Sequence, residues 1–192
     1  MWSCGANSDG RCGFDAGRVG QDGTILEPRE ITQLRGVIKI SAGSKHSACV
    51  TADGRAWCWG SGEHGKLGLG GGNNQPHPTM VERLSYETLI EVKTLTLTQT
   101  FILTQTFILT LTLLLKASCG QDHTAFLTDM GQVYMCGRGS SGQLGLGNER
   151  NTNPVPYMVA ELEELNIVRV ECASNFTCFV TASGKVSLRV AL

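Results

Sequence analysis

Short apolar runs alternate with turn residues along most of this sequence. Residues 37–41, 47–51 and 56–59 are runs of this kind, and the pair Asp53-Gly54 stands between the second and the third. Runs of about 4 to 8 residues bounded by glycine, aspartate or proline are typical of short antiparallel strands joined by tight turns. The segments that follow such runs are broken by glycine, which disfavours helix. The pattern therefore predicts an all-β fold with four short strands in each repeating unit and little helix.

Three blocks of sequence recur in the same order. The first joins Trp or Cys to a glycine and continues into a glycine loop, at residues 2–13, 57–70 and 134–147. The second is a proline followed by an apolar residue three positions on and by leucine six positions on, at Pro28, Pro78 and Pro156. The third occupies residues 41–51, 118–128 and 172–181. The step from Gly5 to Gly60 is 55 residues, near the period of about 40 to 50 residues that marks propeller blades.

The positions that recur in these blocks are predicted to be structural rather than chemical. They are Gly5, Gly10, Gly13, Gly43, His46, Trp59, Gly60, Gly65, Leu67, Gly68, Gly120, His123, Cys136, Gly137, Gly142, Leu144 and Gly145.

The order of these blocks resembles the repeat of the regulator of chromosome condensation family. Other propeller repeats have no support, because the chain contains no Trp-Asp dipeptide and its run of three glycines, residues 70–72, occurs once. The resemblance implies a closed propeller of about seven blades, within the range of about 4 to 8 that closes a ring. The 192 residues hold about three blades. We therefore expect a partial β-propeller of about three four-stranded antiparallel blades, for which closing the ring requires more blades or self-association.

The chain divides into repeat units within a single repeat domain, 1–192. The units are 1–35, 36–91, 92–167 and 168–192, of which the first and the last are partial. In the last unit, residues 187–192 replace the expected Trp-Gly pair and glycine loop.

A low-complexity Thr/Leu stretch, residues 94–115, interrupts one unit. It has no charged residue and contains Thr-Gln-Thr-Phe-Ile-Leu twice. The step from His46 to His123 is 77 residues, and subtracting the 55-residue repeat leaves 22, the length of the stretch. Its length alone would suit a membrane span, but alternating Leu and Thr is strand-like and both flanks belong to one blade. We interpret it as an insertion.

Charge and composition exclude some functions. Charged residues make up 17% of the chain and the net charge is −1, which gives no electrostatic basis for binding nucleic acid or an acidic membrane. Residues 60–65 and 137–142 fit the Gly-x-Gly-x-x-Gly pattern, but the glycine-broken segments after them cannot form the helix that a dinucleotide site needs. No cofactor is expected.

Eight cysteines are present without a Cys-x-x-Cys pair. Cys4 and Cys136 share the repeat position of Trp59, and Cys49 shares that of Phe126. Cysteines that alternate with apolar residues behave as small buried hydrophobes. We expect buried thiols, no metal site and a reducing compartment, the cytoplasm or the nucleus.

His46 and His123 occupy one repeat position, which Phe176 fills in the last unit. No serine, aspartate or cysteine recurs beside them at positions suited to a catalytic triad, so a packing and turn-bonding role is favoured and no catalytic residue is predicted. Loops are where propellers meet partners, and the candidate contacts there are Glu63, His64, Lys66 and Arg138.

Two functions fit these observations. The first is a non-catalytic scaffold for protein–protein interaction. The second, which only the resemblance implies, is guanine-nucleotide exchange on a small GTPase such as Ran, by this chain or by a longer protein of which it is a fragment. No residue of the sequence can be assigned to a GTPase contact.

Overall fold

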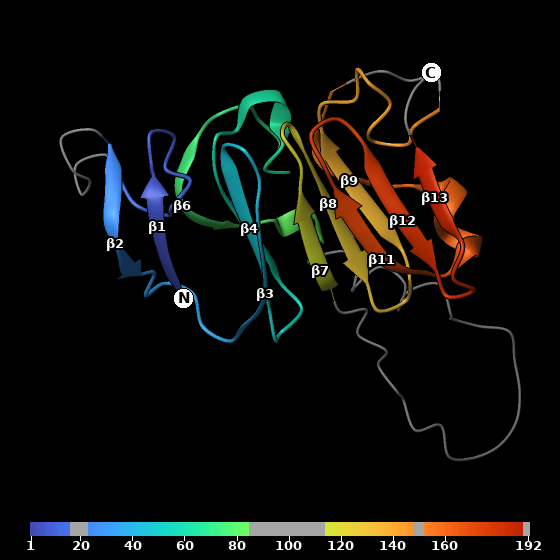
Figure 1. The fold of residues 1–192 in the computed structure, drawn as a ribbon, viewed down its shortest axis with the longest axis horizontal. Helices are drawn as coiled ribbons and strands as arrows, with labels where there is room; N and C mark the ends of the chain where they lie inside the picture. The colour runs from blue at the N-terminus through green and yellow to red at the C-terminus, as the bar shows by residue number, and fades with distance from the viewer. Residues whose placement is uncertain (16–22, 85–113, 148–151, 190–192) are drawn as a thin grey trace, which may run out of the picture.

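Four antiparallel sheets follow one another in chain order from one end of the molecule to the other (Figure 1). They were obtained as a computed structural model, which describes residues 1–15, 23–84, 114–147 and 152–189. We name the sheets A to D. Each sheet is built from strands that are adjacent in the chain, so the sheets follow the order of the sequence.

Sheets B and C each have four strands. Sheet B consists of β3 (Val37–Ala42), β4 (His46–Thr51), β5 (Ala56–Gly60) and β6 (Gln75–Met80). Sheet C consists of β7 (Leu114–Cys119), β8 (His123–Thr128), β9 (Val133–Gly137) and β10 (Asn153–Met158). The prediction of four-stranded antiparallel blades is confirmed in these two sheets.

The sheets at the two ends have fewer strands. Sheet A pairs β1 (Trp2–Ala6) with β2 (Thr24–Glu30), and sheet D contains β11 (Ile167–Cys172), β12 (Thr177–Thr181) and β13 (Val186–Arg189). The described residues also contain the short 3-10 segments η2 (Glu63–Gly65) and η4 (Ala160–Leu165) and a single helical turn at residues 82–84. The expectation of an all-β chain with little helix is confirmed.

Register makes the third strands of the repeats equivalent. Ser47 of β4 pairs with Trp59 of β5, as Thr124 of β8 pairs with Cys136 of β9. In sheet D, Thr177 of β12 pairs with Arg189. Strand β13 therefore forms at the third position even though its sequence lacks the Trp-Gly pair.

The hydrophobic cores lie between neighbouring sheets. The largest joins sheet B to sheet C, where Leu67 and Val81 of sheet B share a cluster with Phe126 of sheet C. A second cluster joins sheet C to sheet D. A smaller one of four buried residues joins sheet A to sheet B, namely Ile31, Leu34, Cys49 and Trp59. Each sheet thus depends on its neighbours for burial.

The proline block forms the outer edge of sheets A, B and C. Pro28, Pro78 and Pro156 lie in the outer strands β2, β6 and β10. The apolar residue that follows turns the chain inward, because its amide donates to the start of the third strand: Val81 N–H bonds to the Ala56 carbonyl at 2.9 Å. The apolar residues and leucines of all three copies are buried.

Most of the predicted insertion lies outside the described residues, which resume at residue 114. Its last two residues, Leu114 and Leu115, begin β7, and Leu114 pairs with Thr128. Within the described residues, no helix is both long and apolar enough to cross a membrane.

Five of the cysteines are buried, and burial raises the pKa of the thiols of Cys49 and Cys119 to about 12. The expectation of burial is wrong for Cys4, which is exposed. The equivalent Trp59 and Cys136 lie in four-stranded sheets, whereas β1 pairs only with β2 in the part of the chain that the structure describes.

Candidate functional site

A buried hydrogen-bond relay joins sheet B to sheet C. His46 Nε2 lies 2.8 Å from Thr124 Oγ1, and the Thr124 hydroxyl donates to the Lys66 carbonyl at 2.7 Å. Because a hydroxyl has a single hydrogen to donate, Thr124 must accept from His46, whose imidazole therefore carries its proton on Nε2. Histidine and loop carbonyl both belong to sheet B, and together they hold the threonine of sheet C.

The same relay recurs between sheets C and D. His123 Nε2 lies 2.9 Å from Thr177 Oγ1, which donates to the Gln143 carbonyl at 2.8 Å. Burial, chiefly, lowers the pKa of His46 to about 3 and that of His123 to about 4. Both imidazoles are therefore neutral at pH 7.

Glycine is required beside each of these rings. A Cβ added to Gly43 would lie 2.7 Å from His46 Cε1 and 2.4 Å from the carbonyl oxygen of Gly120 in the next sheet. At Gly120 the same distances are 2.3 Å to His123 Cε1 and 2.4 Å to the carbonyl oxygen of Ala173. The Gly-x-x-His motif thus lets the backbone of the next sheet approach the ring closely.

A cluster of acidic and basic side chains lies at the junction of sheets B and C. We call Glu63, His64, Asp122 and Arg138 the loop cluster; η2 contributes the first two, the β7–β8 turn Asp122, and the segment after β9 Arg138. The His64 backbone has φ of 60°, a left-handed conformation that is uncommon outside glycine. Glu63 and Arg138 are exposed and His64 is half-buried, so these three side chains are open to a partner.

Lys66 is buried, whereas the sequence predicted an exposed side chain. The sequence placed it in a loop as a candidate partner contact, but its side chain is 0% exposed and its Nζ lies 2.7 Å from Asp122 Oδ1. It is buried because the Gly65–Gly68 loop packs against sheet C, where Pro154 Cα lies 2.4 Å from the position of a Gly65 Cβ. Lys66 is thus an inter-sheet contact and not a surface group.

Asp122 is held between two cations. Its other oxygen, Oδ2, lies 3.8 Å from Arg138 Nη1. Burial alone would raise the pKa of Asp122, but the hydrogen bond from Lys66 and the charges of Lys66, His64 and Arg138 together lower it. Its carboxylate is therefore ionised at neutral pH and fixes the arrangement of the loop cluster.

Donor atoms of Glu63, His64 and Asp122 lie within 4.8 Å of one another, close enough to share a metal ion. Both oxygens of Asp122, however, already face the cationic Lys66 and Arg138. A divalent cation would have to compete with these positive charges, so the arrangement is that of an ion-pair network.

Sequence reasoning missed the hydroxyl residues of the relay and the acidic partner of Lys66. A signal for the first was present, since Ser47, Thr124 and Thr177 each follow the histidine position directly. Asp122 gave no such signal, because the corresponding positions of the other repeats hold Lys45 and Asn175.

Four antiparallel sheets whose cores and relays lie between neighbours define a repeat protein of the β-propeller class. The family model described as the regulator of chromosome condensation (RCC1) repeat matches residues 1–50, 53–93 and 130–180. This is more than half of the chain, which therefore belongs to the RCC1 repeat family.

Several proteins resemble the chain over most of its length. Mouse E3 ubiquitin-protein ligase HERC2 is 32% identical over 97% of this chain, and human RCC1-like G exchanging factor-like protein is 28% identical over 96% of it. The chain spans 3% of the first protein and 37% of the second. It is therefore similar to a part of each.

Solved structures show the same fold. Yeast RCC1 (Prp20), in its complex with Kap60, superposes with a TM-score of 0.72 at 17% identity and covers 98% of this chain and 39% of its own. A second structure, of Prp20p from Saccharomyces cerevisiae, gives a TM-score of 0.67 at 20% identity over 100% of this chain and 40% of its own. The RCC1 propeller fold predicted from the repeats is thereby confirmed.

Proposed function

We propose that this chain is a non-catalytic scaffold that binds another protein through the loop cluster. The observation that carries the proposal is the contrast between buried and accessible polar side chains. His46, Thr124 and Lys66 are buried and joined to the neighbouring sheet, whereas Glu63, His64 and Arg138 are accessible. A rigid frame with a charged, solvent-facing cluster suits recognition of a partner with complementary charges.

The names of the relatives support a scaffold over any one reaction. One relative is named as an E3 ubiquitin-protein ligase and another as a G exchanging factor-like protein. A repeat shared by proteins with such different names supplies a framework more readily than a particular chemistry. The buried thiols suit a reducing compartment, the cytoplasm or the nucleus.

The test compares two matched variants. The proteins labelled by proximity to the wild-type chain in cells are compared with those labelled by two variants. The first variant is Glu63→Ala/His64→Ala/Arg138→Ala. The second, Glu161→Ala/Glu163→Ala/Glu164→Ala, changes exposed residues of η4. Partners lost in the first variant and kept in the second are purified and their dissociation constants measured. We expect binding weaker by about tenfold or more, about 1.4 kcal/mol, with unchanged melting temperature. Equal binding by both variants would exclude the loop cluster.

Guanine-nucleotide exchange is the second candidate, or the activity of a longer protein that contains this chain. It is favoured by the name of the human relative and by yeast Prp20p, whose structure was solved together with its binding properties to Gsp1p and histones. The assay mixes the chain with a Ran-type GTPase loaded with fluorescent nucleotide. We expect little or no acceleration of release. Acceleration by about a thousandfold, about 4 kcal/mol of activation free energy, would replace the scaffold proposal with exchange.

A further inference from the structure

The first strand of each of sheets B, C and D carries a cation at the same position. The residues are Lys39 in β3, Lys116 in β7 and Arg169 in β11, each the third residue of its strand. We call these three residues the cation row. Because the net charge of the whole chain is −1, the row is a local concentration of positive charge that the composition does not reveal.

A backbone irregularity places each cation in the same way. In β3, Val37 pairs with Thr51, and Lys39, two residues on, pairs with the immediate neighbour of Thr51 in β4, so β3 has one extra residue here. The register of β7 shifts in the same way before Lys116, and that of β11 before Arg169. A β-bulge of this kind re-aims the side chains around it. The three cations therefore occupy equivalent positions in the structure as well as in the sequence.

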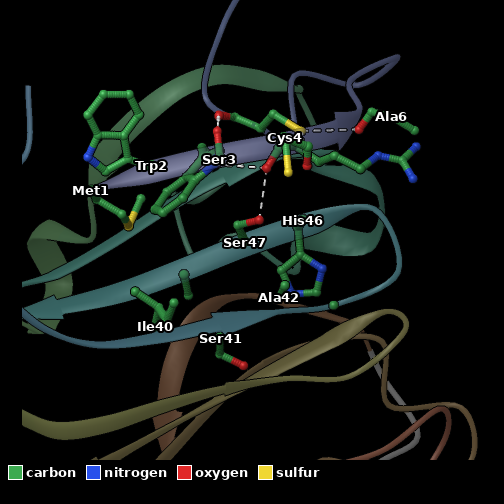
Figure 2. Close-up of a pocket in the computed structure, with 15 residues that line it drawn as sticks. Met1, Trp2, Ser3, Cys4, Ala6, Ile40, Ser41, Ala42, His46 and Ser47 are labelled. Carbon is green, nitrogen blue, oxygen red and sulfur yellow. Dashed lines mark hydrogen bonds between the residues drawn. The ribbon is translucent and has the colours of Figure 1, made fainter. Parts of the chain in front are cut away.

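The three strands that carry the row are neighbours across two junctions (Figure 1). The Cys119 amide of β7 donates to Ser41 Oγ of β3 at 3.0 Å. The Cys172 amide of β11 donates to Ser118 Oγ of β7 at 2.9 Å. Figure 2 shows Ser41 on the side of β3 that faces sheet C. Strand β7 thus lies against β3 as β11 lies against β7, and the two junctions can be compared residue by residue.

At the junction of sheets C and D, a carboxylate joins two members of the cation row. Glu171 Oε1 accepts from Lys116 Nζ of β7 and, at 3.1 Å, from Arg169 Nε of β11. Ser118 Oγ donates to the other oxygen of this carboxylate at 3.4 Å. Hydrogen bonds between ionised partners are stronger than those between neutral groups. This junction therefore shows that the row can hold a carboxylate between cations of two successive sheets.

The junction of sheets B and C has two equivalent cations without that carboxylate. The cations are Lys39 and Lys116, and Ser118 holds the sequence position that Glu171 holds in the next sheet. Lys39 is exposed and has no ion pair among the described residues. A serine side chain is shorter than glutamate and carries no charge, so it does not neutralise the cation in front of it. The three cations of the row thus share one carboxylate.

Exposed apolar side chains lie next to the row. Ile38 and Val168 directly precede Lys39 and Arg169, and they are 52% and 54% exposed. The surface therefore combines apolar area with positive charge. It suits a polypeptide that presents acidic and apolar side chains together. A phosphate polyanion would use the charge alone and would be repelled by Glu171.

We propose that the cation row binds an acidic, extended segment of a partner polypeptide. A carboxylate of that segment lies between Lys39 and Lys116, in the way that Glu171 lies between the two cations of the next junction. An apolar side chain of the segment covers the exposed residue before Lys39. The row lies in the first half of its strands, whereas Asp122 of the loop cluster follows the end of β7. The two surfaces are separate, so this proposal does not depend on the proposed function.

The test measures the binding of a defined acidic peptide to the full chain. A rhodamine-labelled peptide of four Val-Glu repeats is titrated with the protein, and binding is followed by fluorescence anisotropy. A peptide of four Val-Gln repeats is the neutral control. We expect the acidic peptide to bind at least about tenfold more tightly than the neutral one. The difference should shrink as the salt concentration rises, because salt screens charges on the surface.

Two variants with opposite effects make the test specific. Lys39→Met removes a cation without an ion pair and should weaken binding of the acidic peptide by about fivefold or more, at an unchanged melting temperature. Glu171→Gln releases Lys116 and Arg169 and should tighten binding by about threefold or more. Lys45→Met removes an exposed cation beyond the other end of β3. This matched control should leave binding of the acidic peptide unchanged.

Three outcomes would overturn the proposal. The first is equal binding of the acidic and the neutral peptide. The second is an equal effect of Lys39→Met and Lys45→Met, which would show that the row has no special place among the surface cations. The third is tighter binding of an inorganic polyphosphate with the same charge as the acidic peptide, which would assign the row to a phosphate polyanion.

Discussion

Thr124 is the residue that joins sheets B and C at the centre of their junction. Its hydroxyl accepts from His46 and donates to the Lys66 carbonyl. Thr124→Val, which keeps the shape, therefore leaves the buried His46 donor unpaired and leaves the Lys66 carbonyl with only the weak hydrogen bond from the Cys136 thiol. We expect the free energy of unfolding to fall by about 1 to 3 kcal/mol, measured by urea denaturation. Ser47→Ala is the control; its hydroxyl bonds to Arg11 in a half-buried site, and a smaller loss is expected.

The buried histidines make stability depend on pH. Their pKa values in the folded chain are about 3 for His46 and about 4 for His123, against 6.5 for an unperturbed histidine. Between these values the unfolded chain binds more protons, so stability is fully present above pH 6.5 and is lost as pH falls toward 4 and 3. Each histidine contributes a slope of about 1.4 kcal/mol per pH unit at most.

His123→Gln tests this dependence. Urea denaturation between pH 4.5 and 7.5 should show a slope reduced by about half relative to the wild type. An unchanged slope would mean that His123 is protonated in the folded chain or that other groups govern the pH dependence.

The burial of Lys66 is the feature of the candidate site that the sequence predicted least well. Lysine is almost never fully buried unless it is paired, and its partner Asp122 lies 56 residues further along the chain. We expect Lys66→Met to lower the free energy of unfolding by about 3 kcal/mol, because the buried Asp122 carboxylate loses its hydrogen-bonded partner and keeps only the longer ion pair with Arg138. Glu63→Ala, a change at an exposed neighbour, should stay within about 0.5 kcal/mol. Equal losses would show that Lys66 is no more important to folding than the surface.

At the scale of elements, the sequence predicted the strands well and their surroundings less well. Turn residues and apolar runs are local signals, so residues 37–41 and 56–59 lie within β3 and β5. Exposure of Cys4 is not local, because it depends on strands that pair with β1. The same holds for the loop cluster, whose members come from three separate segments. Repeats predict a residue's position in its own sheet better than its contacts with the next.

The stretch 94–115 should be removable without loss of register. Its deletion brings Val92-Lys93 to the positions of Leu114-Leu115, directly before Lys116, so an apolar residue again pairs with Thr128. We expect greater solubility, because an uncharged, proline-free, β-prone run is an aggregation hazard. Expression yield and the cooperativity of urea unfolding measure the outcome. A less soluble or less cooperative product would identify the stretch as an integral part of sheet C.

At the scale of the molecule, the sheets differ in how much core they share. Twelve buried residues join sheets B and C, but four join sheets A and B. Local opening begins where few buried apolar contacts hold the backbone. Hydrogen exchange measured by mass spectrometry should therefore proceed faster in β1 and β2 than in β8 and β9. Uniform exchange would show that the chain opens as a single unit.

The relay has a consequence for how such chains change during evolution. The junctions of sheet B with sheet C and of sheet C with sheet D each combine a Gly-x-x-His motif from one repeat with a hydroxyl from the next. Both inner repeats carry the motif and a hydroxyl residue after it. Exchanging these repeats would keep the relay but would separate Lys66 from its partner Asp122. A repeat with alanine and phenylalanine, as in sheet D, can receive a neighbour before it but cannot dock one after it in the same way. The residues at the glycine, histidine and hydroxyl positions thus limit which repeat can follow which along the chain.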